Sequence, residues 1–178
     1  MDWGATRIEA GGGIVLRPWR ADDLEPLLRH ADDAQVERGL GDRFPHPYTR
    51  ADGEAFLSGR VVDFSDPVFA IEVGGEACGG IGARRLPGNR DVGAEFGYWL
   101  GRAHWGRGVM TRVVAAYAPW VMSALGVARL QAVVLDFNAA SARVLEKNGF
   151  VLEGVLRKAI SKHGRLHDLH LYARLADG

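Results

Sequence analysis

Apolar residues follow two rhythms along this chain, one typical of strands and one typical of helices. Short apolar or alternating runs, bounded by glycine or proline, predict strands at residues 14–19, 68–73, 76–86, 94–100, 130–135, 150–160 and 166–175. Apolar residues at helical spacing predict helices that begin at Asp22 or Asp23, lie within 32–40, follow Thr49, and cover 109–124 and 138–149.

Two of these helices carry further signals. The helix after Thr49 places Leu57, Val61 and Phe64 on one side, so it is expected to reach about residue 64. The helix over 109–124 has one broad apolar face and should bend at Pro119. In the last helix, Asn138 is the expected N-cap and Gly149 the expected C-terminal stop.

The order of the elements predicts a mixed sheet. Residues 68–86 form a hairpin candidate around Gly74-Gly75, which makes the first strands antiparallel. Residues 92–135 predict a strand–helix–strand unit, which implies two parallel strands and a right-handed crossover. We therefore predict a single α/β (α+β) domain over residues 13–178, preceded by a flexible lead-in over residues 1–12.

Composition narrows the class of protein. The 178 residues are 47% hydrophobic and 25% charged, and 22 basic residues balance 22 acidic ones, so neither nucleic acid nor a membrane is an expected partner. The single cysteine, Cys78, excludes an internal disulfide, and His167 and His170 would point to opposite faces of a strand, so no metal is expected. Without a secretory signal or a long apolar run, the expected location is cytoplasmic.

The stretch from Ala94 to Thr111 carries the first sign of chemistry. It passes from a strand through Trp105-Gly106-Arg107-Gly108 directly into a helix, and main-chain N–H groups at such a start bind anions. Nearby basic residues would strengthen the positive field: Arg102, His104, Arg107 and Arg112. The alternative is that the glycines serve only the geometry of the turn. Neither the G-x-x-x-x-G-K-[ST] loop nor a complete G-x-G-x-x-G motif is present.

Several short motifs resemble, in this order, the GNAT superfamily of acetyl-CoA-dependent N-acetyltransferases, and most closely its RimJ/RimL branch. The resemblance covers nearly the whole chain and rests on Leu16-Arg17-Pro18-Trp19, Phe44-Pro45-His46-Pro47-Tyr48-Thr49, Gly97-Tyr98-Trp99-Leu100, His104-Trp105-Gly106-Arg107-Gly108, Asn138-Ala139-Ala140-Ser141 and Val144-Leu145-Glu146-Lys147-Asn148-Gly149-Phe150. It implies a mixed, mostly antiparallel central sheet of about seven strands, with helices on both faces.

The resemblance also implies a ligand, acetyl-CoA or coenzyme A, and the residues that hold it. The pyrophosphate would lie on the backbone of Gly106, Arg107, Gly108, Val109, Met110 and Thr111. The pantetheine arm would pair with the backbone of Tyr98, Trp99 and Leu100, and Asn138 and Ser141 would lie near the thiol. This chain departs from the superfamily pattern at Trp105 and Met110, and at Leu145, where many members have the tyrosine that protonates the thiolate.

Two residues are the candidates for catalysis. Glu95 is a carboxylate in an otherwise apolar strand, so it is the expected base, acting on the amine through water; the alternative is a partner for a nearby arginine. Ser141 is expected to donate a hydrogen bond to the departing thiolate, unless it is only a polar residue in the first turn of a helix. His46, between two prolines, is either part of the acceptor entrance or a surface residue.

The resulting hypothesis is an acetyl-CoA-dependent N-acetyltransferase whose acceptor is a primary amine. Since the chain offers one candidate base and no paired carboxylates, the more acidic α-amine of a protein N-terminus suits it better than a lysine. Two alternatives remain open: a small-molecule acceptor such as a polyamine, amino acid or antibiotic, and a non-catalytic acyl-CoA binding module. A homodimer is a further candidate partner arrangement.

Overall fold

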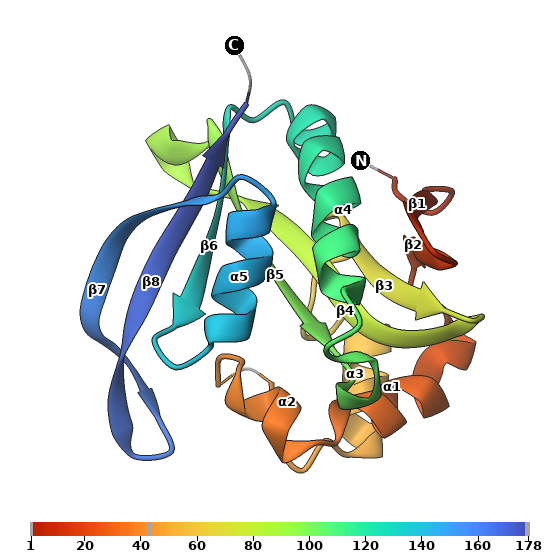
Figure 1. Cartoon of the computed structure of the whole chain (residues 1–178). Helices are drawn as coiled ribbons and strands as arrows, with labels where there is room; N and C mark the ends of the chain where they lie inside the picture. The colour runs from red at the N-terminus through yellow and green to blue at the C-terminus, as the bar shows by residue number, and fades with distance from the viewer. Residues whose placement is uncertain (1, 43, 177–178) are drawn as a thin grey trace.

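The computed structural model describes residues 2–42 and 44–176; Met1, Arg43 and residues 177–178 of the predicted domain lie outside this range. Its centre is an eight-stranded sheet in the order β1-β2-β3-β4-β5-β6-β8-β7 (Figure 1). The strands are β1 (Ile8–Gly11), β2 (Ile14–Pro18), β3 (Val68–Val73), β4 (Glu76–Arg85), β5 (Gly93–Leu100), β6 (Arg129–Leu135), β7 (Val151–Lys162) and β8 (Arg165–Leu175). The helices are α1 (Leu24–Ala31), α2 (Ala34–Arg38), α3 (Arg50–Leu57), α4 (Val109–Leu125) and α5 (Ala139–Lys147).

The sheet is mixed, as the order of elements predicts. Every neighbouring pair of strands is antiparallel except β5 and β6, which run parallel and are connected through α4. The sheet has one strand more than expected, because Ile8–Gly11 pairs with β2 instead of forming part of a loose lead-in. Ile8 and Ala10 pack against the core, which accounts for this strand, but four residues beside a run of glycines gave too short a pattern to predict it.

Helices cover both faces of the sheet. Helices α4 and α5 lie across one face, where Val113, Tyr117 and Leu145 are fully buried in the main core (Figure 1). On the opposite face, α1 and α3 pack in a second cluster that includes Leu27 and Trp99. In the described part of the chain, no helix has the length and apolar character that crossing a bilayer requires.

The ends of the helices show which of the predicted capping residues act as caps. The side chain of Thr49 caps α3 and that of Asn138 caps α5, as expected. The prediction that the Asp23 side chain caps α1 is wrong: its carboxylate binds the guanidinium of Arg17 at 2.7 Å and accepts the backbone N–H of Arg20 at 2.8 Å, in the turn before the helix. Helix α4 continues past Pro119 and ends at Gly126, whose φ of 60° is the left-handed conformation expected there.

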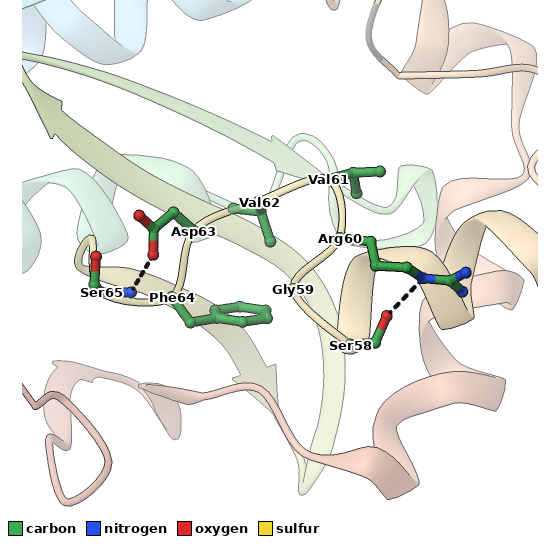
Figure 2. Close-up of a pocket in the computed structure, with 8 residues that line it drawn as sticks. All are labelled: Ser58, Gly59, Arg60, Val61, Val62, Asp63, Phe64 and Ser65. Carbon is green, nitrogen blue, oxygen red and sulfur yellow. Dashed lines mark hydrogen bonds between the residues drawn. The ribbon is translucent and has the colours of Figure 1, made fainter.

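The predicted length of the helix after Thr49 is wrong. Helix α3 ends at Leu57, and Gly59, with φ of 76°, turns the chain away. Residues 58–65 form a loop around a shallow hollow of about 650 Å³, in which Arg60 donates a hydrogen bond to Ser58 (Figure 2). Val61 is 66% exposed, because the helical spacing that suggested a common face does not persist through the glycine.

Candidate active site

Strands β5 and β6 pair over only part of their length. They are in register at Gly93–Arg129, Ala94–Leu130 and Glu95–Gln131, and no pairing between them follows in the described residues. Strand β6 continues to Leu135 along β8, whereas β5 continues to Leu100 along β4 only. The edge of β5 from Phe96 to Leu100 that faces β6 therefore has backbone groups without a strand partner, in the centre of the sheet.

The glycine loop lies directly beyond that free edge. Gly106 and Gly108 both have φ of 71°, a conformation that favours glycine, and Gly108 is the N-cap of α4. Across the described residues, the backbone N–H groups from Gly106 to Thr111 donate to no protein acceptor. A Cβ added at either glycine would meet no atom within 4 Å, so there is open space beside the loop that carries these donors.

The two unusual loop residues do not obstruct this space. Met110 is only 8% exposed and packs into the main core, so its bulk points away from the free N–H groups. The indole N–H of Trp105 donates to the carbonyl oxygen of Leu100 at 2.7 Å. This hydrogen bond ties the start of the loop to the end of β5, although Trp105 is 45% exposed.

The basic residues expected around the loop fall into two groups. Arg102 pairs with Asp33 at 2.9 Å, and burial, helped by nearby positive groups, lowers the pKa of His104. Arg107 and Arg112 form no ion pair with any described residue. The guanidinium of Arg112 lies against Gly12 in the β1–β2 turn, where a φ of 62° favours glycine. Arg107 and Arg112 are therefore the cations left to face an anion.

One face of β5 brings two hydroxyl groups together. The phenol oxygen of Tyr98 lies 2.9 Å from Oγ of Ser141 in the first turn of α5, and Asn138 accepts the backbone N–H of Ser141 at 3.2 Å. Burial raises the pKa of Tyr98 to about 12, so its phenol keeps its proton at neutral pH. Leu145, at the position of the superfamily tyrosine, is fully buried in the core.

The other face of β5 carries Glu95. Its Oε2 accepts a hydrogen bond from Nε2 of Gln131 at 2.9 Å, so its partner is an amide and not the arginine of the alternative interpretation. Arg84 stands opposite Glu95 on β4, but the two form no ion pair in the described structure. The next residue on this face, Gly97, is exposed, and an added Cβ would meet nothing within 4 Å. The floor beside the carboxylate is therefore open.

Aromatic residues border this floor. The ring of Phe44 lies 5.4 Å from that of Trp99 and 5.2 Å from that of Tyr48, which ties the loop before α3 to β5. His46, in the same loop, lies 3.4 Å from the carboxylate of Asp32, at the end of α1. The loop thus forms one wall of the Glu95 face through its aromatic residues, and His46 is held at the side of the loop that contacts Asp32.

Two groups of site residues were not predicted. Arg129 binds Oε1 of Gln131 and the carboxylate of Glu153, which connects Glu95 to the far edge of the sheet. Lys162, in the β7–β8 hairpin, forms a buried ion pair with Glu37 of α2. The Arg129–Glu153 and Lys162–Glu37 contacts join residues 24 and 125 positions apart, so no local pattern signals them. No group of three or more His, Cys, Asp or Glu that could hold a metal occurs among residues 2–42 and 44–176.

Comparison with known proteins supports the same interpretation. Residues 14–151 match the acetyltransferase (GNAT) domain family. The uncharacterized N-acetyltransferase YoaA of Bacillus subtilis is 40% identical over 45% of each chain, and the ribosomal-protein-serine acetyltransferase of Escherichia coli is 33% identical over 47% of each. The chain thus spans about half the length of the curated relatives it matches.

Solved structures extend the likeness to the whole domain. The structure of Mycobacterium smegmatis RimJ in complex with CoA-disulfide has a TM-score of 0.81 and 26% identity, over 96% of this chain and 85% of that one. These relatives confirm the resemblance to the RimJ/RimL branch and the mixed fold with helices on both faces. With its splayed parallel strands, its glycine loop and a matching family over most of its length, this chain belongs to the GNAT acetyltransferase family.

Proposed function

We propose that this protein transfers the acetyl group of acetyl-CoA to the α-amine of a protein N-terminus. The observation that carries the proposal is the cluster of unpaired N–H groups from Gly106 to Thr111, placed where β5 leaves β6. The M. smegmatis RimJ structure contains a CoA derivative, and the E. coli relative is named for a ribosomal-protein serine. Both support this ligand and this kind of acceptor.

The residues present fit coenzyme A. The free N–H groups, the positive end of α4 and the cations of Arg107 and Arg112 suit a pyrophosphate. The free backbone edge of Tyr98, Trp99 and Leu100 suits the amides of a pantetheine arm, which would pair with it as a strand does. Asn138 and Ser141 then lie at the thiol end of that arm, beside the first turn of α5.

The chemistry divides between the two faces of β5. Acetyl-CoA supplies an activated thioester, and the amine nitrogen forms a bond to its carbonyl carbon while the carbon–sulfur bond breaks. A backbone N–H of the free β5 edge stabilises the oxygen that gains negative charge. Glu95 takes the proton of the amine through water, and Ser141 donates a hydrogen bond to the departing sulfur. Tyr98 donates its phenol O–H to Oγ of Ser141, which holds that hydroxyl in place and leaves its proton free for the sulfur.

The acceptor class follows from the strength of the base. An α-amine has a pKa near 8 and a lysine amine one of about 10.4, which makes deprotonation of lysine roughly 3 kcal/mol harder at a fixed pH. Glu95 is a single carboxylate that is open to solvent on one side, which suits the deprotonation of an α-amine better than that of a lysine. The expected cytoplasmic location and the homodimer stay predictions.

Mass spectrometry of a peptide and metabolite library, incubated with acetyl-CoA and the protein, tests this function. The expected result is a mass increase of one acetyl group on peptides with free N-termini, and none on peptides whose N-terminus is blocked. Acetylation of small amines alone would replace the peptide acceptor with a small-molecule one. Thermal stabilisation by coenzyme A without any turnover would leave only an acyl-CoA binding module, and no stabilisation at all would contradict the proposal.

A further inference from the structure

We propose that Gln131 is a positioning residue for Glu95, and that Arg129 and Glu153 hold the Gln131 amide in the one orientation that serves this role. The inference rests on the proposed function, because it concerns the base of that reaction. The four side chains form a continuous hydrogen-bonded chain from β5 through β6 to β7. We call these four hydrogen-bonded side chains the Glu95 support.

The first step concerns the orientation of the amide. Both Nε and Nη2 of Arg129 donate to Oε1 of Gln131, at 3.3 Å each. A guanidinium only donates and an ionised carboxylate only accepts, so Oε1 must face Arg129 and Nε2 must face Glu95. Gln131 is 4% exposed, and the reversed amide would leave two buried polar groups unsatisfied.

The second step concerns what holds Arg129. Its Nη1 and Nη2 bind the two carboxylate oxygens of Glu153 at 2.9 and 2.7 Å, a bidentate pair with fixed geometry. The hydrogen bonds that Arg129 donates to Glu153 outweigh the effect of burial and raise the pKa of Arg129. Arg129 crosses β8, the strand between β6 and β7, to make this pair. The orientation of Gln131 is thus set at the edge of the sheet.

The third step concerns the free oxygen of Glu95. Gln131 engages only Oε2, and Oε1 makes no hydrogen bond with any described residue. The open position at Gly97 adjoins the same face, so the unoccupied oxygen has room for a water or an amine. Glu95 and Gln131 are also the last residues in register before β5 and β6 separate, which fixes the carboxylate at the fork itself.

The charged groups around Glu95 come from three strands. Arg84 stands opposite it on β4, while Arg129 on β6 and Glu153 on β7 reach it only through Gln131. Loss of the Gln131 donor removes the hydrogen bond that orients the carboxylate as a proton acceptor, so the pH dependence of the reaction should change. A support that only stabilised the fold would leave the pH dependence of the reaction unchanged.

The experiment measures kcat/KM for a peptide acceptor as a function of pH, together with the KM for acetyl-CoA. In Gln131→Met, which keeps the side-chain volume, kcat/KM falls about tenfold. The acidic limb of the pH profile, where kcat/KM declines toward low pH, moves up by about one pH unit. In Gln131→Glu, the added carboxylate moves the limb further in the same direction. The KM for acetyl-CoA stays unchanged in both. Gln35→Met, at an exposed position of α2, is the matched control and leaves every parameter unchanged.

The outcomes separate the inference from the proposed function. If Glu95→Gln retains the wild-type pH dependence, Glu95 is not the base and the proposed mechanism fails with the inference. If Glu95→Gln removes the acidic limb but Gln131→Met and Gln131→Glu do not move it, only the inference is overturned. Should Gln131→Met fail to fold, Glu153→Gln at the partly exposed end of the support replaces it, with a smaller shift of the same sign. An unmoved limb in that variant overturns the inference as well.

Discussion

The two faces of β5 differ in whether main-chain or side-chain groups form the site. On the Tyr98 face, the ligand site consists mostly of main chain: a free strand edge, a glycine loop and the first turn of α4, all within residues 96–111. On the Glu95 face, one carboxylate is bound by Gln131 of β6, which connects through Arg129 to Glu153 of β7, and the loop before α3 packs on Trp99 of the same face. The Tyr98 face presents backbone groups, which every sequence has, in a conformation that glycine favours. The Glu95 face depends instead on particular side chains that lie far apart in the sequence.

This difference gives each face its own mode of failure. A change of backbone conformation in the loop should weaken cofactor binding while leaving the acceptor machinery in place. A change of one side chain on the Glu95 face should impair transfer without affecting cofactor binding. A variant that changes only cofactor binding or only acetyl transfer supports this separation of the two faces. A variant that changes both contradicts it.

Substitution of Glu95 should have the largest effect. Glu95→Gln keeps the shape and the contact with Gln131 but cannot accept a proton, so kcat/KM should fall about 100-fold or more. Thermal stabilisation by coenzyme A should equal that of the wild type, because the change lies on the opposite face from Tyr98 and Ser141. Loss of coenzyme A stabilisation in this variant would show that the two faces are not independent.

The buried ion pair of Lys162 and Glu37 should contribute next. It fastens the β7–β8 hairpin to α2, and the side chains are 2% and 10% exposed. Lys162→Met leaves a nearly buried carboxylate whose one remaining partner among the described residues is His163, so the free energy of unfolding should fall by about 3 kcal/mol. Denaturant unfolding at neutral pH measures this, and a change below about 0.5 kcal/mol would contradict it.

The same pair predicts a pH dependence of stability. Hydrogen bonds from Lys162 and His163 outweigh burial and lower the pKa of Glu37 below its ordinary value of 4.5. The stabilisation is therefore fully present above about pH 4.5 and is lost as the pH falls through the lowered pKa. The unfolding free energies of wild type and Lys162→Met should converge at acid pH, and a constant difference would exclude this origin.

Substitution of Gly108 should affect the other face. Gly108→Val forces a β-branched residue into a left-handed conformation, at a cost of roughly 1–2 kcal/mol, and moves the N–H groups that follow. The affinity for coenzyme A, measured by calorimetry, should fall about tenfold or more. Gly97→Ala, at an open position with an ordinary φ, is the control and should bind coenzyme A normally. Equal losses in both variants would argue against the loop as the anion site.

The hydroxyl pair should give the smallest effect. Tyr98→Phe removes one partner of Ser141 without emptying the space, so kcat should fall only a few-fold. Thioester donors with a more acidic leaving thiol need less help, and with them the difference from wild type should disappear. A loss that is equal for all donors would assign Tyr98 a packing role only.

The contrast between the faces also decides how much the sequence reveals. The Gly106–Thr111 loop, the N-cap of Asn138 and the crossover through α4 are local in sequence, and all three are where the pattern predicts them. Glu95 is visible as a carboxylate in an apolar strand, but its partners are not. Gln131 lies 36 residues from Glu95 and reaches it only through the pairing of β5 with β6. Glu153 lies 24 residues from Arg129, and the pairing of β6 with β8 and of β8 with β7 brings these two together.

The wrong predictions have physical causes of the same kind. Helical spacing from Leu57 to Phe64 is real in the sequence, but Gly59 adopts a left-handed conformation that spacing alone does not exclude. Asp23 is a suitable N-cap by residue type, yet the buried guanidinium of Arg17 competes for its carboxylate and wins. In both cases a contact or a conformation outside the local pattern overrides a weak local preference.

The short pairing of β5 with β6 has a mechanical consequence. It divides the sheet into two antiparallel halves, residues 8–100 and residues 129–175, which share few main-chain hydrogen bonds along their common seam. Each half contributes one wall of the seam, while the main core under α4 and α5 joins the two halves on one side of the sheet. A molecule bound in the seam would add contacts to both halves at once, so its binding should raise the free energy of unfolding of the whole domain.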